Sequence, residues 1–200
     1  MQKKQTQKVY IGFTGEKGGG KDTVIKLVRK LLPKKKIGQI RFSDILTDTL
    51  NIWALPRTRE NYIKLSPSFR RTYGPSALSN AVKARAEAAS DDIVFLNGVR
   101  WWEDVKMVRG LNKKGSKSFL VYVTAPVRIR FARIKNRGEK AGEREATFHQ
   151  FMKEEKAYTE IFIPKIGKKA DVVIDNGDTM NKFRNAIKSK ILPLITRRAS

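Results

Sequence analysis

A glycine-rich segment near the amino terminus has residue types and a spacing that suit phosphate binding. The segment reads G-E-K-G-G-G-K-D-T and runs from Gly15 to Thr23. Its first eight residues match the pattern G-x-x-x-x-G-K-[ST] at seven positions, and only Asp22 departs from it. Glycines let successive backbone N–H groups point inward around an anion, and Lys21 could reach the β- and γ-phosphates of a nucleotide. The segment is therefore predicted to bind nucleotide phosphates.

The flanking residues predict the strand and the helix that such a loop requires. Lys8–Thr14 is a short β-type run, and Lys21–Leu32 places its apolar residues on one helical face before Pro33. A helix beginning at Lys21 would add the partial positive charge of its amino terminus to the site. This context disfavours the alternative, a glycine-rich turn that only packs tightly.

Strand-like and helix-like segments alternate along the rest of the chain. Four further strands are expected at Ile37–Phe42, Asp92–Leu96, Ser118–Val123 and Ala170–Ile174. Helices are expected from Asp44, with Ser43 as the N-cap, and over Pro75–Ala89, Trp102–Leu111, Pro126–Arg137, Thr147–Tyr158 and Thr179–Leu192. The segment Asn51–Tyr73 has only weak periodicity. The pattern predicts an α/β fold, a five-stranded parallel sheet with helices on both faces.

Two acidic residues follow the second predicted strand, at the edge of the sheet where ligands of such folds bind. If the bound phosphate is transferred, a carboxylate at Asp44 could orient the molecule that accepts it and take the proton of that molecule. Asp48, one helical turn later, could assist. The alternative is that Asp44 only stabilises the amino terminus of a helix.

Two arginines are candidates to hold the phosphate of an acceptor, because the planar guanidinium can grip phosphate oxygens in two places. Arg100 lies just past the third strand, at a carboxyl end. Arg71 lies in the weakly periodic segment beside Arg70, so only one of the adjacent pair is expected to face the site. For each arginine the alternative is a solvated surface charge.

The composition indicates a basic globular protein. There are 43 Lys and Arg residues against 19 Asp and Glu residues, a formal net charge of +24, so nucleic acid is a possible partner. The absence of cysteine and the single histidine, His149, exclude thiolate and histidine-rich metal sites. No signal peptide is visible and the apolar runs are too short to span a bilayer, so a soluble cytoplasmic protein is expected. The oligomeric state is left open.

The chain resembles the P-loop nucleoside-monophosphate kinases, and within them dephospho-coenzyme-A kinases and the archaeal predicted nucleotide kinases grouped with those enzymes. The matching segments follow the order of that superfamily along nearly the whole chain. They are G-F-T-G-E-K-G-G-G-K-D-T-V (12–24), F-S-D (42–44), R-R-T-Y-G-P (70–75), N-G-V-R (97–100), R-F-A-R-I-K-N-R-G (130–138) and A-D-V-V-I-D-N (170–176).

The resemblance implies one P-loop kinase domain over residues 1–200, with an acceptor-binding region at about 43–90 and a small helical lid at about 128–147. Arg130, Arg133 and Arg137 share one helical face within this lid. Arg133 and Arg137 would act with Lys21 and Asp44 in catalysis by contacting the transferring phosphoryl group and excluding water.

The resemblance also implies a binding site for ATP and Mg²⁺. Asp22 would act on the metal through water, and Asn176, in the turn after the last strand, would lie near the adenine. Asn97 replaces an acid that is common in these kinases, which removes a charge that could help to hold magnesium. The residues expected to bind ATP are Gly15, Glu16, Lys17, Gly18, Gly19, Gly20, Lys21, Asp22, Thr23 and Asn176.

The function expected from these features is transfer of phosphate from ATP to a nucleotide-like small molecule. That acceptor could be an NMP or dNMP, which takes phosphate on a phosphate, or dephospho-coenzyme A, which takes it on a ribose hydroxyl. One alternative is a kinase or ATPase that acts on nucleic acid, such as a polynucleotide 5′-kinase or a ribosome-assembly factor. Another is a nucleotide-gated binding module that performs no transfer.

Overall fold

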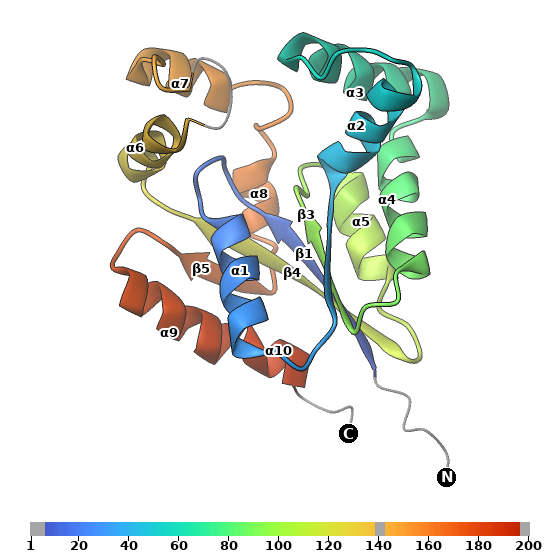
Figure 1. Cartoon of the computed structure of the whole chain (residues 1–200), viewed down its shortest axis with the longest axis vertical. Helices are drawn as coiled ribbons and strands as arrows, with labels where there is room; N and C mark the ends of the chain where they lie inside the picture. The colour runs from blue at the N-terminus through green and yellow to red at the C-terminus, as the bar shows by residue number, and fades with distance from the viewer. Residues whose placement is uncertain (1–6, 139–142, 197–200) are drawn as a thin grey trace.

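The structure is a computed structural model that describes residues 7–138 and 143–196, and a five-stranded parallel sheet lies at its centre (Figure 1). The strand order is β2-β3-β1-β4-β5, so the strand that precedes the phosphate-binding segment is the middle one. The expected fold class is confirmed. The strands are β1 (Lys8–Thr14), β2 (Ile37–Arg41), β3 (Ile93–Asn97), β4 (Ser116–Thr124) and β5 (Val172–Asp175).

Ten helices are described, and most of them connect successive strands. Their bounds are α1 (Lys21–Leu31), α2 (Phe42–Ile52), α3 (Arg59–Tyr73), α4 (Ala77–Ala88), α5 (Trp102–Gly110), α6 (Val127–Arg137), α7 (Phe148–Glu155), α8 (Ile163–Gly167), α9 (Met180–Lys190) and α10 (Leu192–Thr196).

Alternation along the strands produces two apolar layers, one on each face of the sheet. Ile11 and Phe13 of β1 pack with apolar residues of α1 and α9 on one face. Tyr10 of β1 points to the opposite face, where it belongs to the layer formed with α4, α5 and α8. Because side chains of a strand alternate between faces, a chain with two covered faces has nearly continuous apolar strands.

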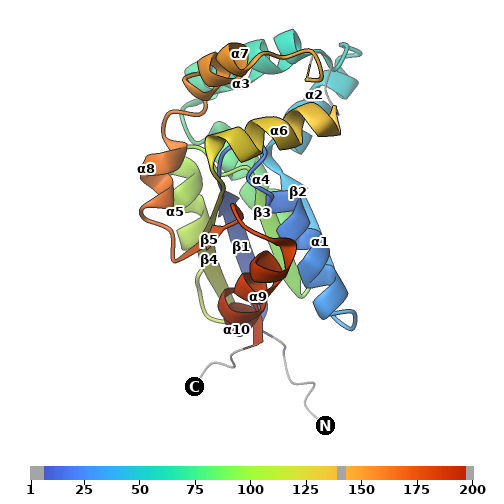
Figure 2. The same ribbon diagram turned by 90° about the vertical axis from the view of Figure 1, so that its left-hand side faces the viewer.

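The elements that could act on a ligand gather at the carboxyl edge of the sheet. Figures 1 and 2 show α6 and α7 on one side of this edge and α2 and α3 on the other. The loop after β3 is tied to the end of β1, because the N–H groups of Gly98 and Val99 donate to the carbonyl oxygen of Phe13 at 3.1 and 3.0 Å. The sheet therefore places the phosphate-binding segment next to Asn97 and Arg100.

Two local features differ from those predicted. Helix α2 begins at Phe42 with Arg41 as its N-cap, because Asp44 accepts the backbone N–H of Arg41, so Ser43 is not the cap. The weakly periodic segment contains a complete helix, α3, despite Pro67 within it. Its Leu65 is buried against Leu46 and Leu50 of α2, and this tertiary packing stabilises a helix that periodicity did not reveal.

Residues 139–142 of the expected lid lie outside the described residues. Among the helices that the structure describes, none combines the length and the apolar character needed to cross a membrane.

Candidate functional site

The phosphate-binding segment forms a loop between β1 and α1 whose shape depends on glycine. Gly20 is the N-cap of α1 and has a left-handed backbone with φ 105°, and its Cα lies against the side chain of Asn176. A Cβ at Gly19 would lie 2.7 Å from the carbonyl oxygen of Val123 in β4, and one at Gly18 would lie 2.7 Å from the carbonyl oxygen of Arg130. The loop is thus seated closely on β4 and α6, and residues with a side chain do not fit there.

Lys21 lies at the start of α1 and bends back over the loop. Its Nζ donates to the carbonyl oxygens of Gly15 and Glu16 at 2.5 and 3.0 Å. Burial, and then the charge of Arg100, lower the pKa of Lys21 from 10.5 to about 8. Neighbouring carboxylates, Glu160 first among them, oppose this shift. An ammonium group in such surroundings gains from the arrival of an anion such as phosphate.

Asp22 is held by three N–H donors that converge on one of its oxygens. Its Oδ1 accepts from Arg41 Nη2 at 2.9 Å, from Gln39 Nε2 at 3.0 Å and from Asn97 Nδ2 at 3.0 Å. Burial disfavours the charged carboxylate, but the hydrogen bonds from Arg41 and Gln39 outweigh it and hold the pKa of Asp22 below its usual value. Asn97 is therefore a partner of Asp22, which an aspartate at the same position would repel.

These surroundings suit a held carboxylate better than a magnesium ligand. Mg²⁺ takes oxygen ligands in an octahedral shell, whereas the donors around Asp22 Oδ1 are N–H groups and include a guanidinium. Among residues 7–138 and 143–196, no group of three or more His, Cys, Asp or Glu side chains is placed to hold a metal. A magnesium role for Asp22 stays a prediction that the geometry does not favour.

Asp44 has a structural partner in the present conformation. Its Oδ2 accepts the backbone N–H of Arg41 at 2.8 Å, which caps the amino terminus of α2. The carboxylate thus performs the alternative role that the sequence had left open, and a role toward an acceptor stays a prediction. Asp48, one turn later, forms an ion pair with Arg85 of α4 at 2.7 Å.

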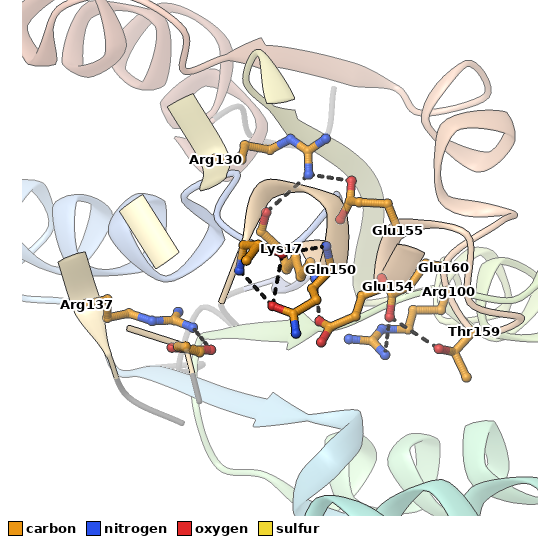
Figure 3. A network of polar contacts seen from close by, with 11 residues as sticks. Lys17, Arg100, Arg130, Arg137, Gln150, Glu154, Glu155, Thr159 and Glu160 are labelled. Carbon is orange, nitrogen blue, oxygen red and sulfur yellow. Dashed lines mark hydrogen bonds and ion pairs between the residues drawn. The ribbon is translucent and has the colours of Figure 1, made fainter. Parts of the chain in front are cut away.

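Arg100 lies near the phosphate loop and is paired there with an acid from a distant segment. Its Nη1 lies 2.9 Å from Oε1 of Glu160, in the connection between α7 and α8 (Figure 3). Both side chains influence the pKa of Lys21, so the pair stands near the phosphate loop. An acceptor carrying an anionic group would compete with Glu160 for this guanidinium.

Of the adjacent arginines in α3, Arg70 and not Arg71 turns toward the loop after β3. The guanidinium carbon of Arg70 lies 4.2 Å from the ring centroid of Trp101, and its Nη2 lies 3.6 Å from Oε2 of Glu103. Arg71 is exposed. Arg70 is thus the inward-facing residue of the pair, and a role of Arg71 toward an acceptor stays a prediction that this geometry does not favour.

Three of the four arginines of α6, namely Arg130, Arg133 and Arg137, share a face but have different partners. Arg130 is buried and donates to the carbonyl oxygen of Lys17 at 3.3 Å and to Oε2 of Glu155 at 2.6 Å (Figure 3). Arg133 donates to the carbonyl oxygen of Asn176 at 2.8 Å. Arg137 donates to Glu143 at 3.0 Å, beyond the undescribed part of the lid. Arg130, rather than Arg133 or Arg137, is therefore the arginine in contact with the phosphate loop.

Two carboxylates of α7 pair with cations at the phosphate loop, one with Lys17 of the loop and one with Arg130 of α6. Lys17 Nζ lies 2.6 Å from Oε2 of Glu154, and Glu155 pairs with Arg130 (Figure 3). The same Nζ lies 4.2 Å from the ring centroid of Phe151. Burial raises the pKa of Glu155, against the lowering effect of Arg130, and its Oε1 is buried without a hydrogen bond in the described structure. Glu154 and Glu155 thus form ion pairs with two cations that an anionic ligand would otherwise contact.

Two further predicted nucleotide contacts serve to fix the loop. Glu16 accepts from the hydroxyls of Tyr122 at 2.5 Å and Thr124 at 3.1 Å, and burial, with this hydrogen bond, raises the pKa of Tyr122 to about 12. Asn176 is buried and donates its amide to the carbonyl oxygen of Gly19 at 2.9 Å. Asn176 thus links the loop to Arg133, and its expected contact with adenine stays a prediction.

Sequence reasoning missed the residues that complete the site from distant segments. Gln39 and Arg41 lie in β2, and no pattern in the sequence connects them with Asp22. Glu154, Glu155 and Glu160 pair with cations more than twenty positions away in the chain, so only the fold brings them there. Arg130 was named from the sequence on the same helical face as Arg133 and Arg137, but the other two were preferred as contacts.

Comparison with known proteins identifies relatives that match nearly the whole chain. No known protein-family model matches the sequence. The UPF0200 protein TK1334 of Thermococcus kodakarensis is 26% identical over 187 residues, which are 92% of this chain and 97% of that protein. The UPF0200 protein PYRAB09750 of Pyrococcus abyssi is 25% identical over 181 residues, 90% of this chain and 93% of that protein. These names assign no activity.

Shikimate kinases are among the solved structures that share this fold. TT1252 from Thermus thermophilus superposes with a TM-score of 0.60 and 16% identity, covering 94% of this chain and 98% of its own. Shikimate kinase from Bacteroides thetaiotaomicron superposes with a TM-score of 0.56 and 13% identity, covering 90% and 95%. Shikimate kinase from Acinetobacter baumannii, solved with shikimate, gives 0.53 and 16%, covering 95% and 94%. At these identities the likeness concerns the fold.

Proposed function

We propose that this protein is an ATP-dependent phosphotransferase with a nucleotide-like small molecule as its acceptor. The observation that carries the proposal is the position of Lys21. This lysine lies at the amino terminus of α1, directly after a glycine-rich loop that follows the central strand. Backbone N–H groups of this loop would hold the phosphates, and Lys21 would exchange its carbonyl partners for phosphate oxygens.

Three cations from two other elements support transfer rather than binding alone. Arg100 follows β3, Arg130 lies on α6 against the loop, and Arg133 lies against the turn after β5. In phosphoryl transfer the bond from the γ-phosphorus to the leaving ADP oxygen breaks as a bond to the acceptor oxygen forms. Guanidinium groups placed around those oxygens stabilise the charge on the transferring group.

The acceptor is proposed at the level of its class. An NMP or dNMP would offer a phosphate to Arg100 or Arg70, and dephospho-coenzyme A would offer a ribose hydroxyl together with anionic groups. Asp44 would need to leave its cap to act as a base, so the geometry leans toward an acceptor that needs cationic contacts. Magnesium would accompany the nucleotide.

An acceptor screen tests the proposal. Purified full-length protein is given ATP, Mg²⁺ and one of NMPs, dNMPs, dephospho-coenzyme A or 5′-hydroxyl RNA, and the phosphorylated product is measured. Lys21→Ala should lower the rate at least about a hundredfold, as expected for a group that stabilises the transition state. Lys26→Ala, an exposed lysine on the same helix, is the matched control and should leave the rate unchanged.

The outcomes separate the candidate functions. Product from one small acceptor, lost in Lys21→Ala, supports the proposal. Product from RNA alone favours the nucleic-acid kinase. ATP binding without transfer to any acceptor favours the nucleotide-gated binding module and contradicts the transferase.

A further inference from the structure

Two positions at the phosphate site differ from the residues that usually hold magnesium in P-loop proteins. One is Asp22, after the loop, and the other is Asn97, at the end of β3. Such loops carry a Ser or Thr on the metal at the position of Asp22, and an acid at the end of a neighbouring strand assists it. Here the acid is on the helix, and the neighbouring strand β3 ends in the amide Asn97. The site therefore still contains a carboxylate, that of Asp22, but its neighbours differ from those in such P-loop proteins.

Those surroundings place a guanidinium where a metal would be expected to compensate Asp22. Arg41 ends β2, at the carboxyl edge of the sheet, and its Nη2 lies 2.9 Å from Asp22 Oδ1. Asn97 and Gln39 donate to the same oxygen from β3 and β2. A cation approaching this oxygen would have to displace a positive charge and two amide N–H groups.

The pairing has little value as a stabilising device. The side chains of Arg41 and Asp22 are 50% and 48% exposed, and ion pairs of that exposure contribute about 0–1 kcal/mol to folding. What the hydrogen bonds do provide is position, because Gln39 and Asn97 hold the carboxylate of Asp22 and this carboxylate holds the guanidinium of Arg41. The guanidinium therefore lies beside the residue that directly follows Lys21. A planar, permanently charged group at this place suits phosphate oxygens.

We propose that Arg41, positioned by Asp22, supplies at the phosphate loop the positive charge that a protein-bound magnesium ion would otherwise supply. Nucleotide phosphates would be bound by Lys21 and Arg41, and the protein would contribute no ligand to the metal. The inference rests on the proposed binding of a nucleotide at this loop. By linkage, a protein that does not contact the metal gains no affinity for the nucleotide when the metal is added.

The test is the affinity for ADP, measured by titration calorimetry with excess Mg²⁺ and again with a chelator. For the wild-type protein the two dissociation constants should agree within about threefold. Arg41→Gln should weaken ADP binding about tenfold under both conditions, because it removes a charge from the phosphates. Arg29→Gln, an exposed arginine near the other end of α1, is the matched control and should bind as the wild type does.

A reciprocal variant tests the role of the carboxylate. Asp22→Thr combined with Asn97→Asp restores the usual hydroxyl and acid, and it should bind ADP about tenfold more tightly with Mg²⁺ than without. If this variant does not fold, as thermal melting would show, the wild type and Arg41→Gln decide the question by themselves.

Two results would overturn the inference, and a third would overturn its premise. Wild-type binding at least about tenfold tighter with Mg²⁺ would show that the protein contacts the metal. Unchanged ADP affinity in Arg41→Gln would show that the guanidinium does not reach the phosphates. ADP binding that is absent, or insensitive to Lys21→Ala, would instead contradict the proposed nucleotide site.

Discussion

Lys21 and Asp22 are neighbours in the sequence, but the fold gives them opposite partners. Lys21 faces carbonyl oxygens of its own loop, and burial and Arg100 make its positive charge less favourable. Asp22 faces donors from β2 and β3, which make its negative charge more favourable. Lys21 is therefore prepared to receive an anion, while the negative charge of Asp22 is already compensated by its hydrogen-bond donors.

The pKa of Lys21 leads to a pH dependence of nucleotide binding. Bound phosphates favour the ammonium form, so the complex has a higher pKa at Lys21 than the free protein, for which it is about 8. Affinity for ADP should be level below pH 8 and should fall above it, by up to about tenfold per pH unit, because binding then requires uptake of a proton.

Calorimetry at about pH 7 to 10, in buffers of different ionisation enthalpy, would measure both the affinity and the proton uptake. The phosphates are already ionised in this range, since their second pKa is about 6. Lys21→Arg keeps its charge and should abolish the decline. An affinity of the wild type that stays level across this range would contradict the shifted pKa.

At the scale of elements, the site depends on how closely the phosphate loop is seated on β4 and α6. The carbonyl oxygen of Val123 lies beneath both Gly15 and Gly19, and that of Arg130 lies beside Gly18. Helix α7 then covers the loop through Glu154. Because these contacts involve backbone on both sides, neither partner can move aside cheaply.

A glycine substitution tests this seating. Gly19 does not have a positive φ, so Gly19→Ala adds steric conflict with Val123 and no left-handed strain. It should lower the free energy of unfolding by about 1–3 kcal/mol, as measured by urea denaturation, and weaken ADP binding. Gly110→Ala, at the end of α5 where no atom lies within 4 Å of the added Cβ, should be neutral or stabilising by up to about 1 kcal/mol. Equal stability of the two variants would mean that the loop is not held against β4.

At the scale of the whole molecule, positive charge gathers at the edge of the sheet opposite the phosphate loop. In a parallel sheet with helical crossovers, the helices end where the next strands begin, and cations are favourable at helix carboxyl termini. Lys34, Lys35 and Lys36 lie exposed between α1 and β2, and Lys113 and Lys114 lie exposed before β4. This edge, the lower one in Figure 1, is the surface on which a nucleic acid would be expected to bind.

Salt dependence tests whether this surface binds RNA. If it does, the logarithm of the affinity for a short RNA should fall linearly with the logarithm of salt concentration, as measured by fluorescence anisotropy. Lys34→Gln with Lys35→Gln should lower the affinity and reduce the slope by about two. Lys153→Gln with Lys156→Gln removes two exposed charges from α7 and its C-cap and should leave the slope unchanged. Equal slopes for the two double variants would exclude this edge as the RNA surface.

The sequence by itself determined the features that depend on local pattern. The alternation of apolar runs predicted a five-stranded parallel sheet, and the glycine spacing predicted the loop and its lysine. Both are local, since the period of a strand and the conformation of a glycine turn are encoded within a few residues. The expected nucleotide site and its acceptor remain predictions for the experiments above.

Only the tertiary structure decided which charges meet. It turned Arg70 inward instead of Arg71, and it brought Glu160 to Arg100 and Arg41 to Asp22. The strand order β2-β3-β1-β4-β5 places the end of β2 beside β3, and hence Arg41 within reach of the loop after β1, which no sequence spacing reports. Charged side chains carry no periodic signal of their partners, because an ion pair depends on positions in space and not on separation along the chain.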